Sequence, residues 1–345
     1  MEWSNVLMVG GREEITDLVS QRTRVDGSMI LPFGDFPQVL EELLRHFYTP
    51  GAHLAAGGHV TPDIELAATH AEVDLVEALG QSPFAADVGS VVSAVRSPRD
   101  LVYVAYPNRV TGAGFTASEL EQLARAVPQG LLLVDEFYFD YFGITALALT
   151  DLLTNVIVFR SFAGPLTTPS CDAGYLLANA QTVRRIRNSL ASRPLTTTMC
   201  KSILSSLIGE EELDSHLHLL HDESLRLATA LNRLNVQCRL TPTDFLLLRV
   251  ADPARVIDYL AGFGLNVDNL DGYPLLKHYL RYRVQPAYVN DRLADAFRKM
   301  PPELYRMKST DRSPLRLRRV ESETPTKHQT VRGQAGDPEV VTRAS

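Results

Sequence analysis

The chain has 345 residues, which is enough for two domains of ordinary size. Its hydrophobic content of 45% and charged content of 22% exclude a collagen-like, coiled-coil or wholly disordered protein. The formal net charge of −7 gives no electrostatic reason to expect nucleic acid as the main partner. Only five of the basic residues are lysines, and the first of them is Lys201.

The sequence carries no recognisable export or membrane signal. Its opening residues lack the basic, apolar and small-residue segments of a signal peptide, and no apolar run approaches the roughly 20 residues of a membrane span. The three cysteines, Cys171, Cys200 and Cys238, are far apart, which argues against a disulfide framework or a zinc site. We therefore expect a reduced, cytoplasmic protein that binds no metal, nucleic acid or membrane.

Short apolar runs followed by turn residues mark the first half of the chain. They cover residues 6–9, 101–105, 131–134 and 156–159 and predict strands that are buried on both faces. Between the second and third runs, residues 116–127 predict a helix that begins with a capping box, either Thr116 with Glu119 or Ser118 with Glu121. Alternating strands and helices predict an α/β fold with a mostly parallel, doubly wound sheet.

The second half predicts a smaller α+β domain. From about Leu176 the pattern becomes helical, and two strand-like runs at 245–250 and 279–284 then flank a helix near 254–263. Beyond Lys308 apolar periodicity ends, which predicts a disordered tail. We therefore divide the chain into a large domain at 1–180, the rest of the large domain with the small domain at 181–307, and a tail at 308–345.

Several motifs occur in an order and spacing typical of one enzyme family. The chain resembles the class I/II aminotransferases of the fold-type I pyridoxal-phosphate enzymes, closest to the histidinol-phosphate aminotransferase branch, over about residues 5–300. The motifs are Tyr106-Pro107-Asn108-Arg109-Val110-Thr111-Gly112, Leu133-Val134-Asp135-Glu136-Phe137-Tyr138, Val158-Phe159-Arg160-Ser161-Phe162, Asp172-Ala173-Gly174-Tyr175, Thr243-Asp244-Phe245-Leu246 and Tyr279-Leu280-Arg281.

The resemblance implies roles for three residues. Asp135 falls on the aspartate that pairs with the pyridine nitrogen of the cofactor, and Tyr138 on the tyrosine that touches the ring hydroxyl. Both are our candidate catalytic and cofactor-binding residues. Arg281 falls on the arginine that binds the substrate carboxylate. From the residues alone, a strand-end aspartate, a core aromatic residue and a surface arginine stay open as alternatives.

The departures from the family pattern concern the cofactor. Arg109 replaces the asparagine that meets the ring hydroxyl. In the family's Ser-x-Ser-Lys motif Ser161 persists, Ala163 replaces the second serine, and Gly164 stands where the Schiff-base lysine is expected. Asp172 occupies the place of a phosphate-binding arginine. A carboxylate about 4 Å from a phosphate is repelled by about 4 kcal/mol per unit charge at an effective dielectric of 20. Covalent attachment of pyridoxal phosphate is therefore not expected, and Arg109 is predicted to pair with Asp135 or Asp172.

Two further segments bear on the site. Gly10-Gly11 is typical of a glycine turn that opens a helix, and we assign Gly11 to phosphate binding, although Glu13 and Glu14 could satisfy the helix dipole by themselves. Residues 37–86 resemble an insertion of little clear periodicity. The family's N-terminal arm is missing from the match.

These observations favour a divergent aminotransferase-like protein that binds or converts a small amino-acid-like ligand without conventional covalent transamination. One alternative is an enzyme that holds pyridoxal phosphate noncovalently and uses Tyr138, Asp135 and Arg281. Another is a non-catalytic subunit that forms a homodimer, or a heterodimer with an active homologue.

Overall fold

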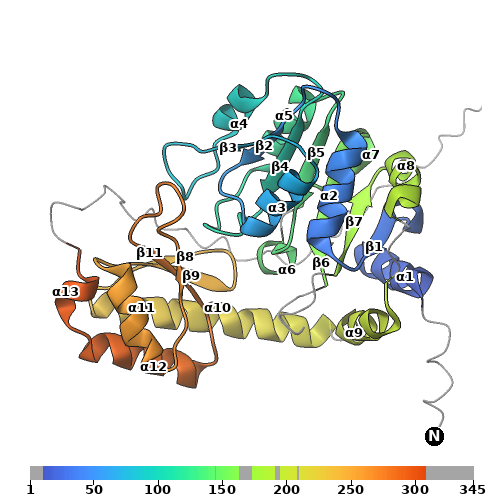
Figure 1. Cartoon of the computed structure of the whole chain (residues 1–345). Coiled ribbons are helices and arrows are strands. Elements are labelled where there is room, and N and C mark those ends of the chain that lie inside the picture. Colours follow the sequence, from blue (N-terminus) through green and yellow to red (C-terminus); the bar gives the residue numbers. More distant parts are fainter. Residues whose placement is uncertain (1–10, 144, 163–172, 191–194, 208–209, 308–345) are drawn as a thin grey trace, which may run out of the picture. The chain divides into compact units, whose positions relative to one another are not determined.

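The computed structural model describes residues 11–143, 145–162, 173–190, 195–207 and 210–307. In this part of the chain, a large sheet contains seven strands in the order β1-β7-β6-β5-β4-β2-β3 (Figure 1). All are parallel except β7, which is antiparallel to β6 and β1. The strands are β1 (Ile30–Phe33), β2 (Leu54–Gly57), β3 (Leu75–Ala78), β4 (Leu101–Ala105), β5 (Leu131–Asp135), β6 (Val156–Ser161) and β7 (Gly174–Ala178).

Helices cover both faces of this sheet, so each face has its own apolar core. One face packs against α2 (Phe36–Phe47), α3 (Pro62–His70) and α8 (Ala180–Leu190). The other face packs against α1 (Arg12–Thr23), α4 (Val88–Ala94), α5 (Ala117–Ala126), α7 (Leu147–Leu152) and α9 (Thr197–Leu207). The short segments η1 (Gly27–Met29) and α6 (Phe139–Phe142) connect larger elements. The predicted doubly wound α/β fold is confirmed.

The apolar runs form strands because their side chains are buried on both sides. All five residues of β4 and of β5 are buried, as expected for central strands between two helical layers. Helix α5 begins at the predicted capping box, in which Thr116 and Glu119 bond each other's backbone amides. The predicted strand at residues 6–9 lies outside the described residues.

A smaller antiparallel sheet forms the second lobe. Its strand order is β10 (Asp268–Asn269), β11 (Tyr279–Arg283), β9 (Phe245–Arg249) and β8 (Gln237–Leu240). One of its faces shares a core with α10 (Glu210–Arg233), α11 (Pro253–Ala261), α12 (Ala287–Lys299) and α13 (Pro302–Tyr305). The predicted strands at 245–250 and 279–284 and the helix near 254–263 are confirmed.

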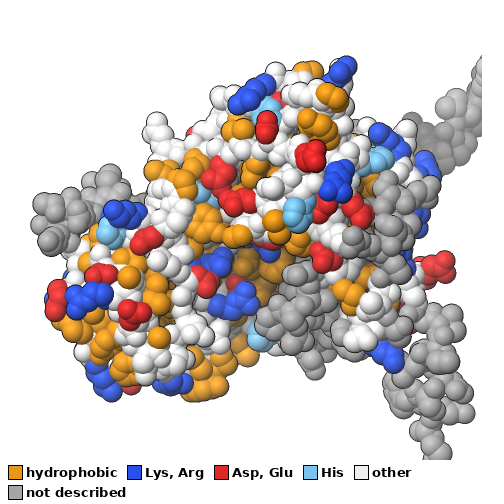
Figure 2. Space-filling view, viewed as in Figure 1, with side chains coloured by type: hydrophobic (Ala, Val, Ile, Leu, Met, Phe, Trp, Pro, Cys, Tyr) orange, Lys and Arg blue, Asp and Glu red, His pale blue; other side chains and the backbone are white. Residues whose placement is uncertain are grey.

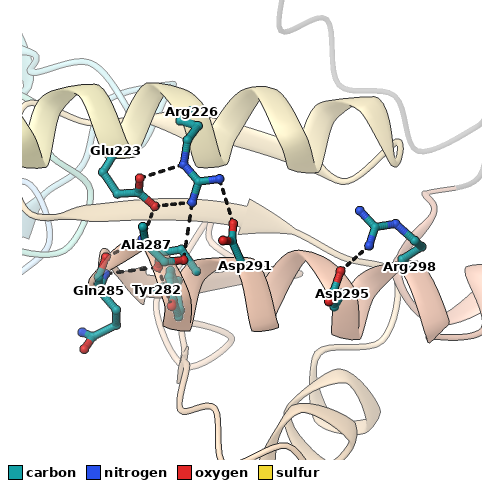
Figure 3. Close-up of polar contacts among 9 residues, drawn as sticks. Glu223, Arg226, Tyr282, Gln285, Ala287, Asp291, Asp295 and Arg298 are labelled. Atoms are coloured by element: carbon teal, nitrogen blue, oxygen red, sulfur yellow. Dashed lines mark hydrogen bonds and ion pairs between the residues drawn. The ribbon is translucent and has the colours of Figure 1, made fainter.

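Polar contacts join the helices of this lobe. The Arg226 guanidinium of α10 lies 2.7 Å from carboxylate oxygens of both Glu223 and Asp291, the latter on α12 (Figure 3). The buried Asn290 amide donates to Glu223 and its oxygen accepts from the Tyr282 hydroxyl. These bonds pull the pKa of Glu223 below its ordinary value.

Two expectations about chain organisation are wrong. Residues 37–86 are not an irregular insertion, because they contain most of α2 together with β2, α3 and β3, and β2 lies inside the sheet between β4 and β3. The pattern also does not become helical at Leu176, because β7 continues to Ala178. Short strands such as Leu54-Ala55-Ala56-Gly57 lack the β-branched residues that identify a strand.

The contacts of the chain group the residues up to Met307 into one compact unit, so the boundary proposed at residue 180 stays a prediction. The predicted tail at 308–345 lies outside the described residues. None of the helices in the described ranges is both long and apolar enough to cross a membrane.

Candidate functional site

The candidate site lies where parallel strands of the large sheet end. Ala105 of β4, Asp135 of β5 and Phe159 of β6 are aligned by the strand register, so the polar segments that follow them leave the same edge of the sheet. Ligands of open α/β sheets bind at this carboxyl edge. Asp135 is only 2% exposed, and its carboxylate is the buried acid of this edge that the sequence singled out.

Three groups surround the Asp135 carboxylate. The Tyr103 hydroxyl donates to Oδ2 at 2.7 Å, the Phe137 backbone N–H donates to Oδ1 at 3.0 Å, and an Arg109 guanidinium nitrogen lies 3.6 Å from Oδ2. Burial raises the pKa of Asp135, whereas Arg109 and the two hydrogen bonds counteract this shift. The carboxylate therefore has both a cation and donors of its own within the protein.

Arg109 is held between two acids and two aromatic rings. Its guanidinium lies 3.1 Å from the Asp63 carboxylate of α3, in addition to Asp135. It also lies over the rings of Phe137, at 4.8 Å, and Phe36, at 5.7 Å. Burial alone would lower the pKa of Arg109, but Asp135 and then Tyr103 and Asp63 raise it above its ordinary value. The predicted Arg109–Asp135 ion pair is confirmed, and the alternative acid, Asp172, lies outside the described residues.

The loop that carries Arg109 is shaped by its neighbour Asn108. The Asn108 side-chain oxygen accepts from the backbone N–H groups of Val110 and Thr111, and its amide donates to the His59 carbonyl oxygen at 2.8 Å. Gly112 then takes a φ of +72°, which favours glycine. The loop thus fixes the direction from which Arg109 enters the site.

Tyr138 and Arg281 lie beside this pair. The Arg281 guanidinium donates to the Arg109 carbonyl oxygen at 2.9 Å and to the Asp268 carboxylate at 2.9 Å. Tyr138 is buried against Phe245, the first residue of β9. Burial, and secondarily Asp244, raises the pKa of the Tyr138 phenol, so its hydroxyl is a neutral donor at ordinary pH. The structure therefore brings together Asp135, Arg109, Tyr138 and Arg281.

The other two predicted residues lie elsewhere around the sheet. Ser161 ends β6, two residues beyond the register partner of Asp135, and pairs with Gly174 of β7. Gly11 precedes the first residue of α1, and a Cβ placed there would meet nothing within 4 Å. The contacts that surround Asp135 involve neither residue. Ala163 and Gly164 lie outside the described residues.

Three residues of the site were not identified from the sequence. Tyr103 lies in a run that predicts only an apolar strand, although it is the one residue of that run with a hydroxyl group. Asp63 and His59 lie within residues 37–86, where the sequence predicted no regular elements. The imidazole of His59 is buried and lines a cavity of about 20 Å³ beside Asp87, and neither of its nitrogens has a hydrogen-bond partner among the described residues.

The three lysines within the described ranges are all exposed. Lys201 lies in α9, Lys277 lies in the loop before β11, and Lys299 ends α12. In the space-filling view, basic and acidic side chains occur side by side in the region between the large-sheet part and the small antiparallel sheet (Figure 2). The cations described at the site are instead the guanidiniums of Arg109 and Arg281, which can bind carboxylates.

The sequence of this chain also matches a protein-family model. The model for aminotransferases of class I and II covers residues 12–297. This chain belongs to that aminotransferase family.

Among curated members of the aminotransferase family, the histidinol-phosphate aminotransferase of Chlorobaculum tepidum is 28% identical over 62% of this chain. That of Chlorobium luteolum is 29% identical over 57% of this chain. These matches span 62% and 55% of the relatives' own lengths.

Solved aminotransferase structures share the fold. The histidinol-phosphate aminotransferase of Sinorhizobium meliloti, in complex with pyridoxal-5'-phosphate, aligns with a TM-score of 0.73 at 18% identity, over 83% of this chain and 81% of that one. A putative histidinol-phosphate aminotransferase of Erwinia carotovora atroseptica gives the same TM-score and identity, over 83% and 85%. The fold of this chain is that of the fold-type I aminotransferases.

Proposed function

We propose that this chain is a divergent aminotransferase-fold protein that binds a small amino-acid-like ligand at the Asp135–Arg109–Arg281 site and does not perform conventional covalent transamination. The observation that carries the proposal is the engagement of the Asp135 carboxylate by Arg109 and Tyr103.

The residues around Asp135 fit a pyridoxal phosphate poorly. A pyridinium nitrogen needs a carboxylate that is free to receive it, but Asp135 already has Arg109 as its cation and two hydrogen-bond donors. A second cation at the same carboxylate would be repelled by the Arg109 guanidinium. The family resemblance adds that Gly164 stands where the Schiff-base lysine is expected. No step of the proposed function therefore uses the cofactor.

The remaining groups suit a ligand with a carboxylate. The Arg281 guanidinium is about one-quarter exposed and can present a planar pair of donors to a carboxylate beside its bond to the Arg109 carbonyl. The neutral Tyr138 hydroxyl can donate one further hydrogen bond. Asp63, whose carboxylate contacts the same Arg109 nitrogen as Asp135 does, is an acceptor that suits an ammonium group. An amino acid carries both groups.

Visible spectroscopy tests the loss of covalent chemistry. Purified protein is mixed with pyridoxal phosphate, and its spectrum is recorded before and after borohydride reduction. We expect no Schiff-base absorption band and no covalently reduced label. A stable band with a label that maps to one lysine would overturn the proposal, and a bound but unreducible cofactor would favour the noncovalent enzyme instead.

Calorimetric titration with a panel of amino acids and keto acids tests the ligand class. We expect binding that weakens about tenfold or more in Arg281→Gln, because a charge-assisted pair with the carboxylate is lost. Arg255→Gln on α11 is the matched control, since Arg255 is exposed on the same lobe. Equal affinities of wild type and Arg281→Gln would refute the assigned role of Arg281. Co-purification with a lysine-bearing homologue would favour the non-catalytic subunit.

A further inference from the structure

One face of the small sheet carries arginines outside the Asp135 site. In the strand register Arg239 of β8 lies opposite Leu247 of β9, and Arg249 of β9 lies opposite Tyr279 of β11. Directly opposed residues, and residues two apart on one strand, share a face of an antiparallel sheet. Arg239 and Arg249 are therefore diagonal neighbours on one face, with the Tyr279 side chain beside them.

Contacts with aromatic rings hold both guanidiniums in this place. Arg239 lies 4.7 Å from the centre of the Phe84 ring, and Arg249 lies 5.9 Å from that of Tyr279. The two rings contact each other edge to face at 5.1 Å. Burial raises the pKa of the Tyr279 phenol, whereas Arg249 and Arg239 lower it, so both cations act on that hydroxyl.

The two cations have no acidic partner in the part of the chain that the structure describes. Neither guanidinium forms an ion pair with a carboxylate of the described residues, and the Nε atom of Arg249 is buried without any hydrogen-bond partner. Arg239 forms a long hydrogen bond of 3.5 Å to the Phe84 carbonyl oxygen. Burial lowers the pKa of Arg239, and Tyr279 is the group that opposes this shift. Two partly buried like charges are costly unless an anion neutralises them.

We propose that Arg239, Arg249 and Tyr279 form a binding site for a phosphate dianion, separate from the Asp135 site. Two guanidiniums supply two positive charges and fork-shaped donor pairs that match phosphate oxygens. A single carboxylate would leave one of the charges unbalanced. Leu247 lies between Arg239 and Arg281 in the register, so apolar atoms separate the new site from the candidate carboxylate-binding arginine. Both arginines are partly exposed, which leaves the site open to a ligand.

The test measures the melting temperature and the dissociation constant of the full chain. Sodium phosphate is compared with sodium chloride of equal ionic strength, and glycerol 3-phosphate serves as a second probe. We expect phosphate-specific stabilisation of the wild type. Arg239→Gln and Arg249→Gln should each weaken phosphate binding by about tenfold or more, and Tyr279→Phe by a smaller factor. Tighter binding of glycerol 3-phosphate would identify a phosphate ester as the source, and tighter binding of inorganic phosphate would identify the free ion.

The stability of the ligand-free variants separates a binding site from a structural role. Because neither arginine has a counter-charge among the described residues, neutralising it should leave the melting temperature without phosphate unchanged or higher. Arg255→Gln should bind phosphate like the wild type, and so should Arg281→Gln, which makes the result independent of the proposed function. The proposal is overturned if the wild type shows no phosphate-specific stabilisation, or if both glutamine variants keep the full response.

Discussion

Asp135 and Glu136 are adjacent buried acids, and each of them faces an arginine. The Glu136 carboxylate is completely surrounded by donors: the Arg160 guanidinium at 2.9 Å, the Thr145 hydroxyl at 2.9 Å and the Ala146 backbone N–H at 2.6 Å. Arg160 also stacks on the Phe139 ring and bonds Thr145.

The Asp135 pair is looser and more open. Its cation lies at 3.6 Å rather than 2.9 Å, and Arg109 is shared with the second acid, Asp63. The Arg109 side chain is 19% exposed, against 5% for Arg160. One strand end thus presents a closed pair toward the protein interior and an open pair toward the candidate site. The closed pair is buried away from any ligand, whereas the partly exposed Arg109 guanidinium of the open pair can still donate to one.

Removing the cation of the closed pair should have the largest effect on stability. Arg160→Leu leaves the Glu136 carboxylate buried without a counter-charge, and we expect a loss of about 3–5 kcal/mol in the free energy of unfolding. Chemical denaturation measures this loss. The double variant Glu136→Gln/Arg160→Leu should recover part of it, because no charge is then left unpaired. If the double variant is less stable than Arg160→Leu alone, the pair is not the reason for the loss.

The same substitution in the open pair should cost less. Arg109→Leu leaves Asp135 with the Tyr103 hydroxyl and the Phe137 N–H, and water can reach the vacated position, so we expect a loss of about 1–3 kcal/mol. The measurement is again chemical denaturation, side by side with Arg160→Leu. The comparison between the two pairs fails if Arg109→Leu is the more destabilising of the two.

The sequence predicts the sheet better than it predicts the site. The runs at 101–105 and 131–134 are long, aliphatic and buried on both faces, so local composition and final structure agree. Leu54–Gly57 is equally buried, but its alanines and glycine owe their strand conformation to the neighbours β3 and β4. Such dependence on tertiary contacts is invisible in a local pattern.

The site likewise contains residues that motifs predict and residues that only tertiary contacts bring in. The Arg109–Asp135 pair was predicted because family motifs placed both residues near one cofactor. Asp63 was not predicted as a site residue, because the sequence did not predict the helix that carries it. The part played by Tyr103 depends on the register that sets it across from Leu133 and near the Asp135 carboxylate, and a hydroxyl in an apolar run gives little sign of such a partner.

The burial of His59, which lies near the Asp135–Arg109 pair, can be tested through the pH dependence of stability. The expected change in the free energy of unfolding is smaller than those of the arginine variants. Burial lowers the pKa of its imidazole below the ordinary value of 6.5, so the folded protein disfavours the protonated form. Its ring faces Tyr273 and lies 4.0 Å from the Glu77 carboxylate, whose own pKa burial raises.

The sign of the pH effect follows from proton binding. As the pH falls below about 6.5, the unfolded chain protonates His59 before the folded chain does, so stability decreases until the pH passes the folded pKa. Glu77 acts in the opposite direction. Between pH 7 and pH 5 the wild type should therefore lose more stability than His59→Gln, measured by denaturation at each pH. If the free energy of unfolding of His59→Gln and of the wild type changes equally with pH, the imidazole takes up a proton as readily in the folded protein as in the unfolded chain.

The smallest effect is expected at the exposed ion pair between Arg281 and Asp268. The two groups lie 2.9 Å apart, but the Asp268 side chain is 62% exposed and that of Arg281 is 28% exposed. Solvent screens such a pair, so Asp268→Asn should change the free energy of unfolding by less than about 1 kcal/mol. The same substitution releases the Arg281 guanidinium from a competing carboxylate, and affinity for a carboxylate ligand should then rise while stability hardly changes. Denaturation and titration of the same preparation measure both quantities. A loss of stability as large as that of Arg109→Leu would place Asp268 among the closed contacts, and weaker ligand binding would mean that Asp268 orients Arg281 rather than competing for it.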